Sequence, residues 1–240
     1  MDRLIYTALT GMRARTAAQA VTANNLANAG VTGFRRELSS LASRYLNGPE
    51  GGVRVQADDA VTTASMEPGH ISPTGQPLDV AVAGPGWIAV QAADGGEAYT
   101  RRGDLRVAPT GVLETGDGHP VMGNSGVITL PAGEPSIAAD GSVSVRLAGA
   151  APAVIDRIRL VDPAPGDLHK DSAGLFRSTG SPDAAPVTLQ IGALEGANVD
   201  TARSLVELIE QSRGFDVSAK LLSATREIDE AGAKLMRIDR

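Results

Sequence analysis

The distribution of proline constrains this chain more than any other feature of its sequence. Of the 14 prolines in 240 residues, 13 lie between positions 50 and 195, whereas residues 1–48 and 196–240 contain none. Proline removes a backbone donor and breaks helix interiors and central strands. The two flanks can therefore form long helices, and the proline-rich middle must consist of short elements that are joined by turns.

The middle of the chain alternates short apolar runs with turn residues, which is typical of β-structure. SIAADGSVSVRL carries Asp140-Gly141 between two alternating segments, and this pair is the strongest short signal for a β-hairpin. A second hairpin is predicted at Gly111, between the runs LRV and VLET. We therefore predict a central β-rich domain over residues 76–190, preceded by an extended linker region over residues 37–75.

The C-terminal flank, residues 191–240, has the pattern of one long helix of about ten turns. Asn198, Asp200 and Thr201 are each able to cap its first turn, because a short side chain can accept the free N–H groups there. Apolar residues then recur every three or four positions along two adjacent stripes. The first stripe consists of Leu205, Leu208, Ser212, Phe215, Ala219 and Leu222, and the second of Leu221, Ala224, Ile228, Ala231, Leu235 and Ile238.

The N-terminal flank, residues 1–36, is predicted to be helical and one-sided as well. It carries many small residues, which allow another helix to approach closely. The apolar stripes of both flanks fit an ordinary intramolecular core, and they fit equally a seam at which the two ends meet each other and copies in neighbouring molecules. The periodicity does not decide between these interpretations.

The segment TANNLANAGVTGF crowds three asparagines into five positions near the predicted end of the N-terminal helix. Asn28 and Gly30 fit a helix stop, because Asn and Gly tolerate the left-handed conformation found there. Asn24 and Asn25 fall within the last turns instead, and a helix stop does not explain them. We predict that these two amides form a side-chain network with another helix.

Composition excludes several classes of function. The net charge of −6 and a pI of about 5.1 leave no overall signature of nucleic-acid binding. The first 36 residues carry five arginines against one aspartate, which favours a solvated helix face over a nucleic-acid or membrane arm. The chain has no cysteine, so disulfides, thiolate catalysis and cysteine-based zinc sites are excluded.

No credible active site can be assembled from the sequence. His70, His119 and His169 are far apart in loop-like segments, and none has a partner at metal-ligand spacing. GPGWIA formally matches a dinucleotide-binding loop, but a β-prone run follows it where a helix is required. Trp87 is predicted to be a core residue. We predict no enzymatic activity, no cofactor and no metal.

The start of the chain, MDRLIYTALTGMRARTA, lacks the pattern of a cleavable signal peptide. The sequence has no run of 18 apolar residues, the minimum expected of a membrane-spanning helix. By these ordinary rules the protein is predicted to be cytoplasmic.

Three motifs in chain order resemble the axial proteins of the bacterial flagellum, the rod and hook family. NNLANAGVTGF resembles the family's N-terminal signature, LDVAVAGPGWIAVQ and YTRRGDLRV its central motif, and GALEGANVD with LVELIEQSRGFDVSAKLL its C-terminal block. The chain departs from the family pattern at Ile88, where a second aromatic residue is usual, at Ala197 in place of Ser, and at Asp216 in place of Glu. The likeness extends over nearly the whole chain.

The resemblance implies an α+β fold in which the N- and C-terminal helices form an α-helical coiled-coil domain beside the central β-rich domain. It implies a structural, self-associating subunit of the basal-body rod that transmits torque from motor to hook and filament. The start of the chain and its short length resemble members of the proximal rod, and members of the distal rod share every motif. A hypothesis of another class is a soluble ligand-binding β module with dimerising helices.

The resemblance also implies partners and location. The partners are copies of the chain, other rod proteins and the flagellar type III export apparatus, with no nucleic acid, no small-molecule substrate and no membrane insertion. The location is corrected to the basal body in its periplasmic span, reached without a cleaved signal. The predicted assembly interface consists of Asn24, Asn25, Leu26, Asn28, Phe34, Leu205, Leu208, Phe215, Leu222, Ile228 and Leu235.

Overall fold

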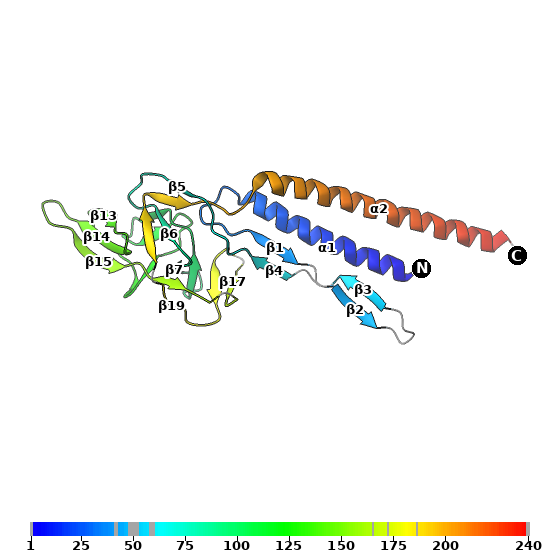
Figure 1. The fold of residues 1–240 in the computed structure, drawn as a ribbon, viewed down its shortest axis with the longest axis horizontal. Coiled ribbons are helices and arrows are strands. Elements are labelled where there is room, and N and C mark those ends of the chain that lie inside the picture. The colour runs from blue at the N-terminus through cyan, green and yellow to red at the C-terminus, as the bar shows by residue number, and fades with distance from the viewer. Residues whose placement is uncertain are drawn as a thin grey trace. The chain divides into compact units, whose positions relative to one another are not determined.

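The computed structural model describes residues 2–40, 43–47, 53–57, 61–164, 166–171, 173–185 and 187–238. The chain divides into two compact units (Figure 1). The helical unit comprises Met1–Ala27, Glu37–Thr63 and Val199–Arg240, and the β body comprises Asn28–Arg36 and Ala64–Asn198. The domain boundaries given by the sequence stay a prediction.

The helical unit contains two helices, α1 (Asp2–Ala27) and α2 (Thr201–Ile238). Its strands are β1 (Glu37–Ser40), which pairs with β4 (Val61–Ala64), and β2 (Ser43–Asn47), which pairs antiparallel with β3 (Val53–Ala57). The amide of Arg203 donates to the Asp200 carboxylate at 3.1 Å. Asp200 is therefore the cap of α2 among the three residues that the sequence offered.

The prediction of a coiled-coil domain formed by the terminal helices is wrong. The helices α1 and α2 lie side by side (Figure 1), but the apolar stripes of α2 do not form a packed seam between them. Leu205, Leu221 and Ile228 are 48%, 56% and 67% exposed. A coiled coil requires such residues to interlock with the facing helix. The fold is a β-rich body with one N-terminal and one C-terminal helix.

Two contacts between the helices are polar or involve a small residue. The Gln211 amide donates to the Thr22 hydroxyl at 3.0 Å, and Gly214 lies so close to the Arg15 guanidinium that an added Cβ would meet it at 2.2 Å. Periodicity alone could not reveal this, because small and polar residues also recur at helical spacing.

The β body is built on a six-stranded antiparallel sheet in the order β17-β18-β8-β7-β16-β19. Its strands are β17 (Leu168–Lys170), β18 (Phe176–Ser178), β8 (Glu97–Thr100), β7 (Trp87–Gln91), β16 (Leu160–Asp162) and β19 (Asp183–Ala184). A three-stranded sheet follows the order β13-β14-β15, with β13 (Glu134–Ile137), β14 (Ser142–Arg146) and β15 (Ala153–Arg157).

Four antiparallel pairs complete the β body. They are β5 (Ile71–Pro73) with β21 (Ala193–Glu195), β6 (Val80–Ala83) with β20 (Thr188–Ile191), β9 (Leu105–Val107) with β10 (Leu113–Thr115), and β11 (Met122–Gly123) with β12 (Gly126–Val127). Both hairpins predicted from turn residues are confirmed. Gly141 has a φ of 87° between β13 and β14, and Gly111 has a φ of 84° between β9 and β10.

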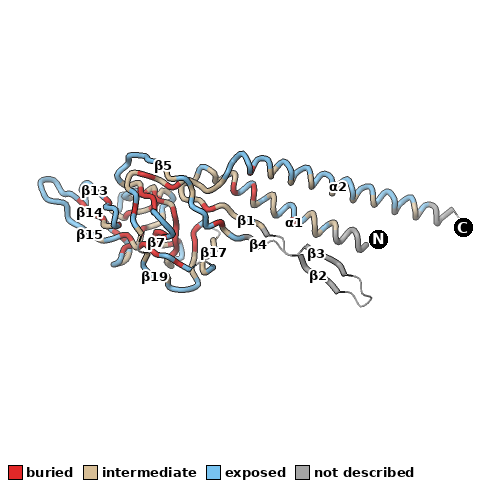
Figure 2. The backbone as a smooth tube through the Cα atoms, in the orientation of Figure 1, coloured by how far each residue is buried: buried red, intermediate tan, exposed pale blue. Residues whose placement is uncertain are grey.

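The apolar core covers both faces of strand β7, since successive side chains of a strand point to opposite faces. Ile88 and Val90 belong to the main core, whereas Trp87 and Ala89 belong to a smaller cluster with Tyr99, Val161 and Phe176. Figure 2 shows the buried segments concentrated in the β body, with α2 exposed along most of its length. The prediction that Trp87 is a core residue is confirmed, because it is only 4% exposed.

Candidate assembly site

The asparagines of the N-terminal signature differ in their burial and contacts. Asn25 is buried, and its amide pairs with both backbone groups of Glu37 in β1, donating to the carbonyl at 2.8 Å and accepting from the amide at 2.7 Å. The side chain thus acts as a short piece of β-strand that ties α1 to β1. The network to another helix that the sequence predicted for Asn25 is replaced by this backbone contact. Asn24 is exposed on α1.

The chain leaves α1 through a turn that begins at Asn28, whose carbonyl accepts from the Val31 amide at 3.0 Å. The left-handed glycine of this segment is Gly33, with a φ of 68°, and Gly30 has no positive φ. A Cβ added at Gly33 would lie 2.4 Å from the Arg101 carbonyl carbon. The sequence pointed to Gly30, whereas both the conformation and the close approach require glycine at position 33.

A buried triad of charged residues lies in the β body directly after this turn. Glu195 contacts Arg35 at 2.8 Å and Arg101 at 3.3 Å, and all three side chains are at most 4% exposed. Glu195 also accepts from the Gly69 amide at 2.8 Å. The triad therefore joins the segment that follows α1, the end of strand β8 and strand β21, whose positions in the chain are far apart.

The arginines of the triad find further partners among carbonyl groups and an aromatic ring. Arg35 donates to the carbonyl of Glu67, and Arg101 donates to those of Val82 at 3.1 Å and Gly84 at 2.5 Å. Both guanidinium groups lie over the Trp87 ring, at 5.8 and 5.3 Å from its centre. Cation–π contacts of this kind are strongest where water is excluded.

Burial governs the electrostatics of the triad. It lowers the pKa of Arg101 to about 10, although Glu195 acts in the opposite direction, and it lowers the pKa of Arg35 for the same reason. A buried ion cluster of this kind contributes little net stability, but removing one member leaves an uncompensated buried charge. The triad therefore serves to place three segments of the β body relative to one another.

Two further residues hold the same segment. Asn198 accepts from the Arg36 amide at 2.6 Å and donates to the carbonyls of Ser65 and Glu67. The Lys170 ammonium lies 4.0 Å from the centre of the Phe34 ring and donates to the Arg35 carbonyl at 3.2 Å. Phe34, a predicted interface residue, is thus half-buried within the β body.

The sequence alone did not identify the buried triad of Arg35, Arg101 and Glu195. It also did not identify Gly33 as the glycine that the turn requires. Arg35 was interpreted as part of a solvated face, and a lone glutamate in a β segment resembles a surface residue. The one signal available was the position of Gly33, Phe34 and Arg35 directly after the asparagine motif.

The predicted interface residues of α2 are mainly exposed. Leu205 and Phe215 are 48% and 36% exposed, and Leu208 and Leu222 are half-buried. Leu235 lies in α2, but its side chain is outside what the structure describes, and Leu26 of α1 is half-buried. These placements do not test an assembly role for the residues.

The side of α2 opposite Ser204 and Leu208 carries an apolar stripe that the described part of the chain leaves exposed. Val206, Val217 and Ile228 are 56%, 63% and 67% exposed, and Leu221 lies beside them. The first three follow one another at intervals of 11 residues, which corresponds to three turns of helix and keeps them on one side. We call Val206, Val217, Leu221 and Ile228 the outer stripe.

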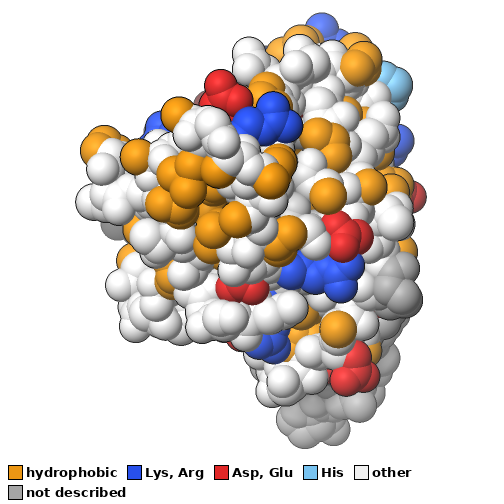
Figure 3. Space-filling model, turned by 90° about the vertical axis from the view of Figure 1, so that its left-hand side faces the viewer, with side chains coloured by type: hydrophobic (Ala, Val, Ile, Leu, Met, Phe, Trp, Pro, Cys, Tyr) orange, Lys and Arg blue, Asp and Glu red, His pale blue; other side chains and the backbone are white. Residues whose placement is uncertain are grey.

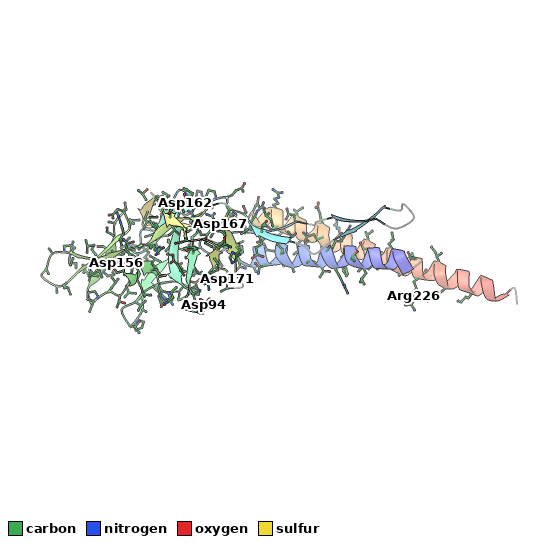
Figure 4. All side chains as sticks on the ribbon, turned by 90° about the horizontal axis from the view of Figure 1, so that it is seen from below. Asp94, Asp156, Asp162, Asp167, Asp171 and Arg226 are labelled. Atoms are coloured by element: carbon green, nitrogen blue, oxygen red, sulfur yellow. The ribbon has the colours of Figure 1, made fainter. Side chains whose placement is uncertain are left out.

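Polar interactions elsewhere are ordinary surface pairs. Figure 4 labels Asp94 and Asp171, the two carboxylates that contact Arg177 at 2.8 and 3.5 Å, and the hydrogen bond from Arg177 lowers the pKa of Asp94. Arg226 on α2 pairs with Glu230 at 3.0 Å. Across the described ranges, no three His, Asp or Glu side chains gather as metal ligands. Neither α1 nor α2 combines the length and apolar character needed to cross a bilayer.

Three families match the chain in order. Residues 5–35 match the flagella basal body rod protein family, residues 81–145 the D1 domain of the flagellar hook protein FlgE/F/G family, and residues 190–235 the C-terminal family of the flagellar basal body rod FlgEFG proteins. The first match includes the asparagine motif, and the second includes Trp87 of β7 and Arg101, which follows β8. The third includes Glu195 and the outer stripe.

Full-length relatives agree with these matches. The flagellar basal-body rod protein FlgF of Salmonella typhimurium is 39% identical over 98% of this chain and 99% of that protein. FlgF of Escherichia coli is 38% identical over 97% of this chain and 96% of its own length. The rod protein FlgG of Bacillus subtilis is 30% identical over 99% of this chain and 100% of its own length.

Proposed function

We propose that this chain, which belongs to the family of flagellar basal-body rod proteins, is a structural subunit of the proximal part of the rod. The observation that carries the proposal is the outer stripe of α2. Its four residues are all at least 56% exposed, although each is a large apolar side chain. Exposed apolar patches of this kind mark surfaces that bind another molecule.

The physical chemistry of α2 supports the same conclusion. A helix of 38 residues is about 57 Å long, and such a helix gains most of its stability by burying an apolar side. In this chain the contact with α1 includes the hydrogen bond from Gln211 to Thr22, and the outer stripe remains in water. Neighbouring rod subunits would cover the stripe and supply the missing stabilisation, so that the helix becomes rigid only in the assembly and can then transmit torque.

We extend the proposal to the remaining predicted interface residues. Asn24 is exposed on α1, and Leu205 and Phe215 are exposed on α2, so each would be accessible to contact from a neighbouring subunit. Asn25, Asn28 and Phe34 would act indirectly, because they hold the chain where it leaves α1. The partners of the subunit are other rod proteins and copies of the same chain, and the role is structural rather than enzymatic.

The location of the chain in the basal body follows from its family, and we propose two finer points. The subunit lies in the periplasmic span of the rod. It reaches that place through the flagellar type III export apparatus, with an N-terminal signal that is not cleaved. Both points rest on the resemblance of residues 5–35 to the rod family. Mass analysis of the protein isolated from basal bodies tests the second, because the mature chain should begin at its encoded start.

An epitope-tagged copy tests the function directly. We expect purified basal bodies to retain the tagged protein, and a protein found only in the soluble fraction would contradict a role in the rod. Ile228→Asp should abolish retention and swimming, because it places a charge in the outer stripe. Glu227→Gln is the matched control on the same turn of α2, and it should be retained. Normal swimming with Ile228→Asp would show that the stripe is not an interface.

A further inference from the structure

The three-stranded sheet β13-β14-β15 has two unlike edges. At one edge, β13 carries Glu134 and Pro135, and charge and proline are the usual means of protecting an edge strand from pairing. At the other edge, the first half of β15 carries Val154 and Ile155, which are 69% and 40% exposed. One edge is therefore protected against association, and the other is apolar and open.

The open edge continues into the loop that joins β14 to β15. Leu147 is 46% exposed at the start of this loop, and the stretch from Leu147 to Ile155, LAGAAPAVI, contains no charged residue. The Ala150 amide donates to the Leu147 carbonyl at 3.0 Å, and Gly149 has a φ of 78°, so the loop closes in a defined turn. We call residues 147–155 the apolar tip. Figure 3 looks onto this end of the β body and shows hydrophobic side chains gathered on its face.

A groove of about 650 Å³ lies on the β13 side of the same sheet. Its apolar wall includes Leu78, Leu105, Val107, Pro109, Leu130 and Pro135. The two charged residues that line it already have partners within the chain. Asp79 accepts from the Thr74 hydroxyl at 2.5 Å, and Arg106 pairs with Glu114 at 2.7 Å. The groove therefore favours an uncharged, apolar occupant.

We propose that the apolar tip of one copy packs into the groove of a second copy in the rod. Val154 and Ile155 of the tip lie on β15 and Pro135 of the groove on β13, and these are the two edge strands of one small sheet. A contact between two different surfaces of the same chain is head-to-tail, and it links copies into a ring or an open helix according to the rotation between them. The proposal rests on the proposed function, because it needs copies of the chain side by side in the rod.

The size of the contact predicts how it acts. Stable interfaces between proteins bury roughly 1,200–2,000 Å² of surface, and a tip of nine residues in a groove of this volume falls short of that range. The contact therefore sets the lateral register of copies that the helices already hold together. A freely dissolved chain should not dimerise through it.

Disulfide crosslinking tests the proposal in a chain that has no cysteine of its own. Thr110 lines the groove, and Val154 is more exposed than Leu147 and Ile155 of the tip. We expect Thr110→Cys/Val154→Cys to form dimers and larger species in oxidised basal bodies. Reduction should return these species to monomer. Each single variant should remain monomeric, as should the control Thr110→Cys/Val127→Cys, because Val127 is exposed on β12, outside the lining of the groove.

The outcomes separate this inference from the proposed function. If basal bodies fail to retain the tagged native chain, both the assignment to the rod and the proposed contact are wrong. If basal bodies retain the double variant but oxidation yields only monomer, the contact alone is wrong, as it would be if another rod protein or a small molecule filled the groove. A second pair, Thr110→Cys/Leu147→Cys, should also crosslink. It tests the same contact at another residue of the tip, in case the geometry at Val154 does not allow a disulfide. Equal crosslinking in the Val127 control would overturn the inference as well.

Discussion

The β body and the helical unit differ in how far their large side chains are buried. In the β body, valines and isoleucines such as Val80, Ile88 and Val143 are fully buried, and even the charged triad of Arg35, Arg101 and Glu195 is removed from water. In the helical unit, Val217 and Ile228 are 63% and 67% exposed. The centre of the β body thus buries its side chains by itself, whereas α2, like the apolar tip, leaves apolar surface for another molecule.

This difference assigns different tasks to the two regions. A region with a closed core keeps its shape before and after assembly. A helix with an uncovered apolar side gains its full stability only when a partner arrives, so its order is coupled to assembly. Substitutions in the core of the β body should accordingly affect the isolated chain, and substitutions in the outer stripe of α2 should affect the assembled rod.

The same substitution at a valine in each region should give the largest contrast. Val143 is fully buried and Val217 is 63% exposed. Val143→Asp should destabilise the β body by roughly 4 kcal/mol or more, because it buries an unpaired carboxylate. Val217→Asp should change the free energy of unfolding by less than about 0.5 kcal/mol. Thermal unfolding of the two purified variants measures the contrast, and equal losses would show that α2 is already packed in the monomer.

The charged triad provides the second test. Glu195→Gln should lower the stability of the β body by about 3–5 kcal/mol, because two buried arginines lose their counter-charge. A loss of this size corresponds to a fall in melting temperature of about 10 °C in a chain of this length. The control is Glu114→Gln, which removes the partner of a 59% exposed arginine and should cost at most about 1 kcal/mol. A Glu195→Gln variant that melts like the control would mean that the triad is not closed in solution.

The exit from α1 should be sensitive at one glycine and tolerant at the other. Gly33→Ala places a Cβ against the backbone of Arg101 and strains a residue with a φ of 68°, so we expect a loss of roughly 2–3 kcal/mol. Gly30→Ala meets no atom within 4 Å and should leave stability nearly unchanged. Denaturant titration of both variants gives the comparison. A larger loss at position 30 than at position 33 would contradict this description of the turn.

The paired asparagines should differ in the same manner. Asn25→Ala removes both hydrogen bonds to the backbone of Glu37 and should cost about 1–3 kcal/mol in the helical unit. Asn24→Ala alters an exposed position and should leave the melting of the purified chain unchanged while weakening retention in basal bodies. Hydrogen exchange over β1 should reveal the loss in Asn25→Ala. Unaltered exchange there would show that Asn25 does not hold β1.

The smallest effect concerns pH. Burial raises the pKa of Tyr99 from 10 to about 12, so the folded chain keeps the phenol proton more tightly than the unfolded chain. The stability that Tyr99 contributes is complete below pH 10 and is lost as the pH rises towards 12. The difference in unfolding free energy between the native chain and Tyr99→Phe isolates the contribution of Tyr99 and should shrink from pH 10 to 12. A constant difference would contradict the raised pKa.

Local features of the sequence were sufficient to predict the two helices and two of the hairpins. The absence of proline from the flanks permitted α1 and α2, the Asp140-Gly141 pair placed one hairpin and Gly111 placed another, and Asp200 was among the predicted caps. These features depend on interactions within a few residues, and such interactions are visible in a linear string. The three family motifs are local in the same sense.

Which surfaces meet depends on contacts between residues that are far apart in the chain. The ion pair of Arg35 with Glu195 joins positions that are 160 residues apart, and no local pattern marks either residue as buried. The pattern of α2 showed apolar stripes, but whether α1 covers them depends on the side chains that α1 presents, which are polar or small at Thr22 and Arg15. Position 33 requires glycine for two reasons: its φ is positive, and the backbone of Arg101 leaves no room for a Cβ. Periodicity predicts which residues lie on one side of a helix or strand. Burial also depends on the element that packs against that side, and only the fold places that second element there.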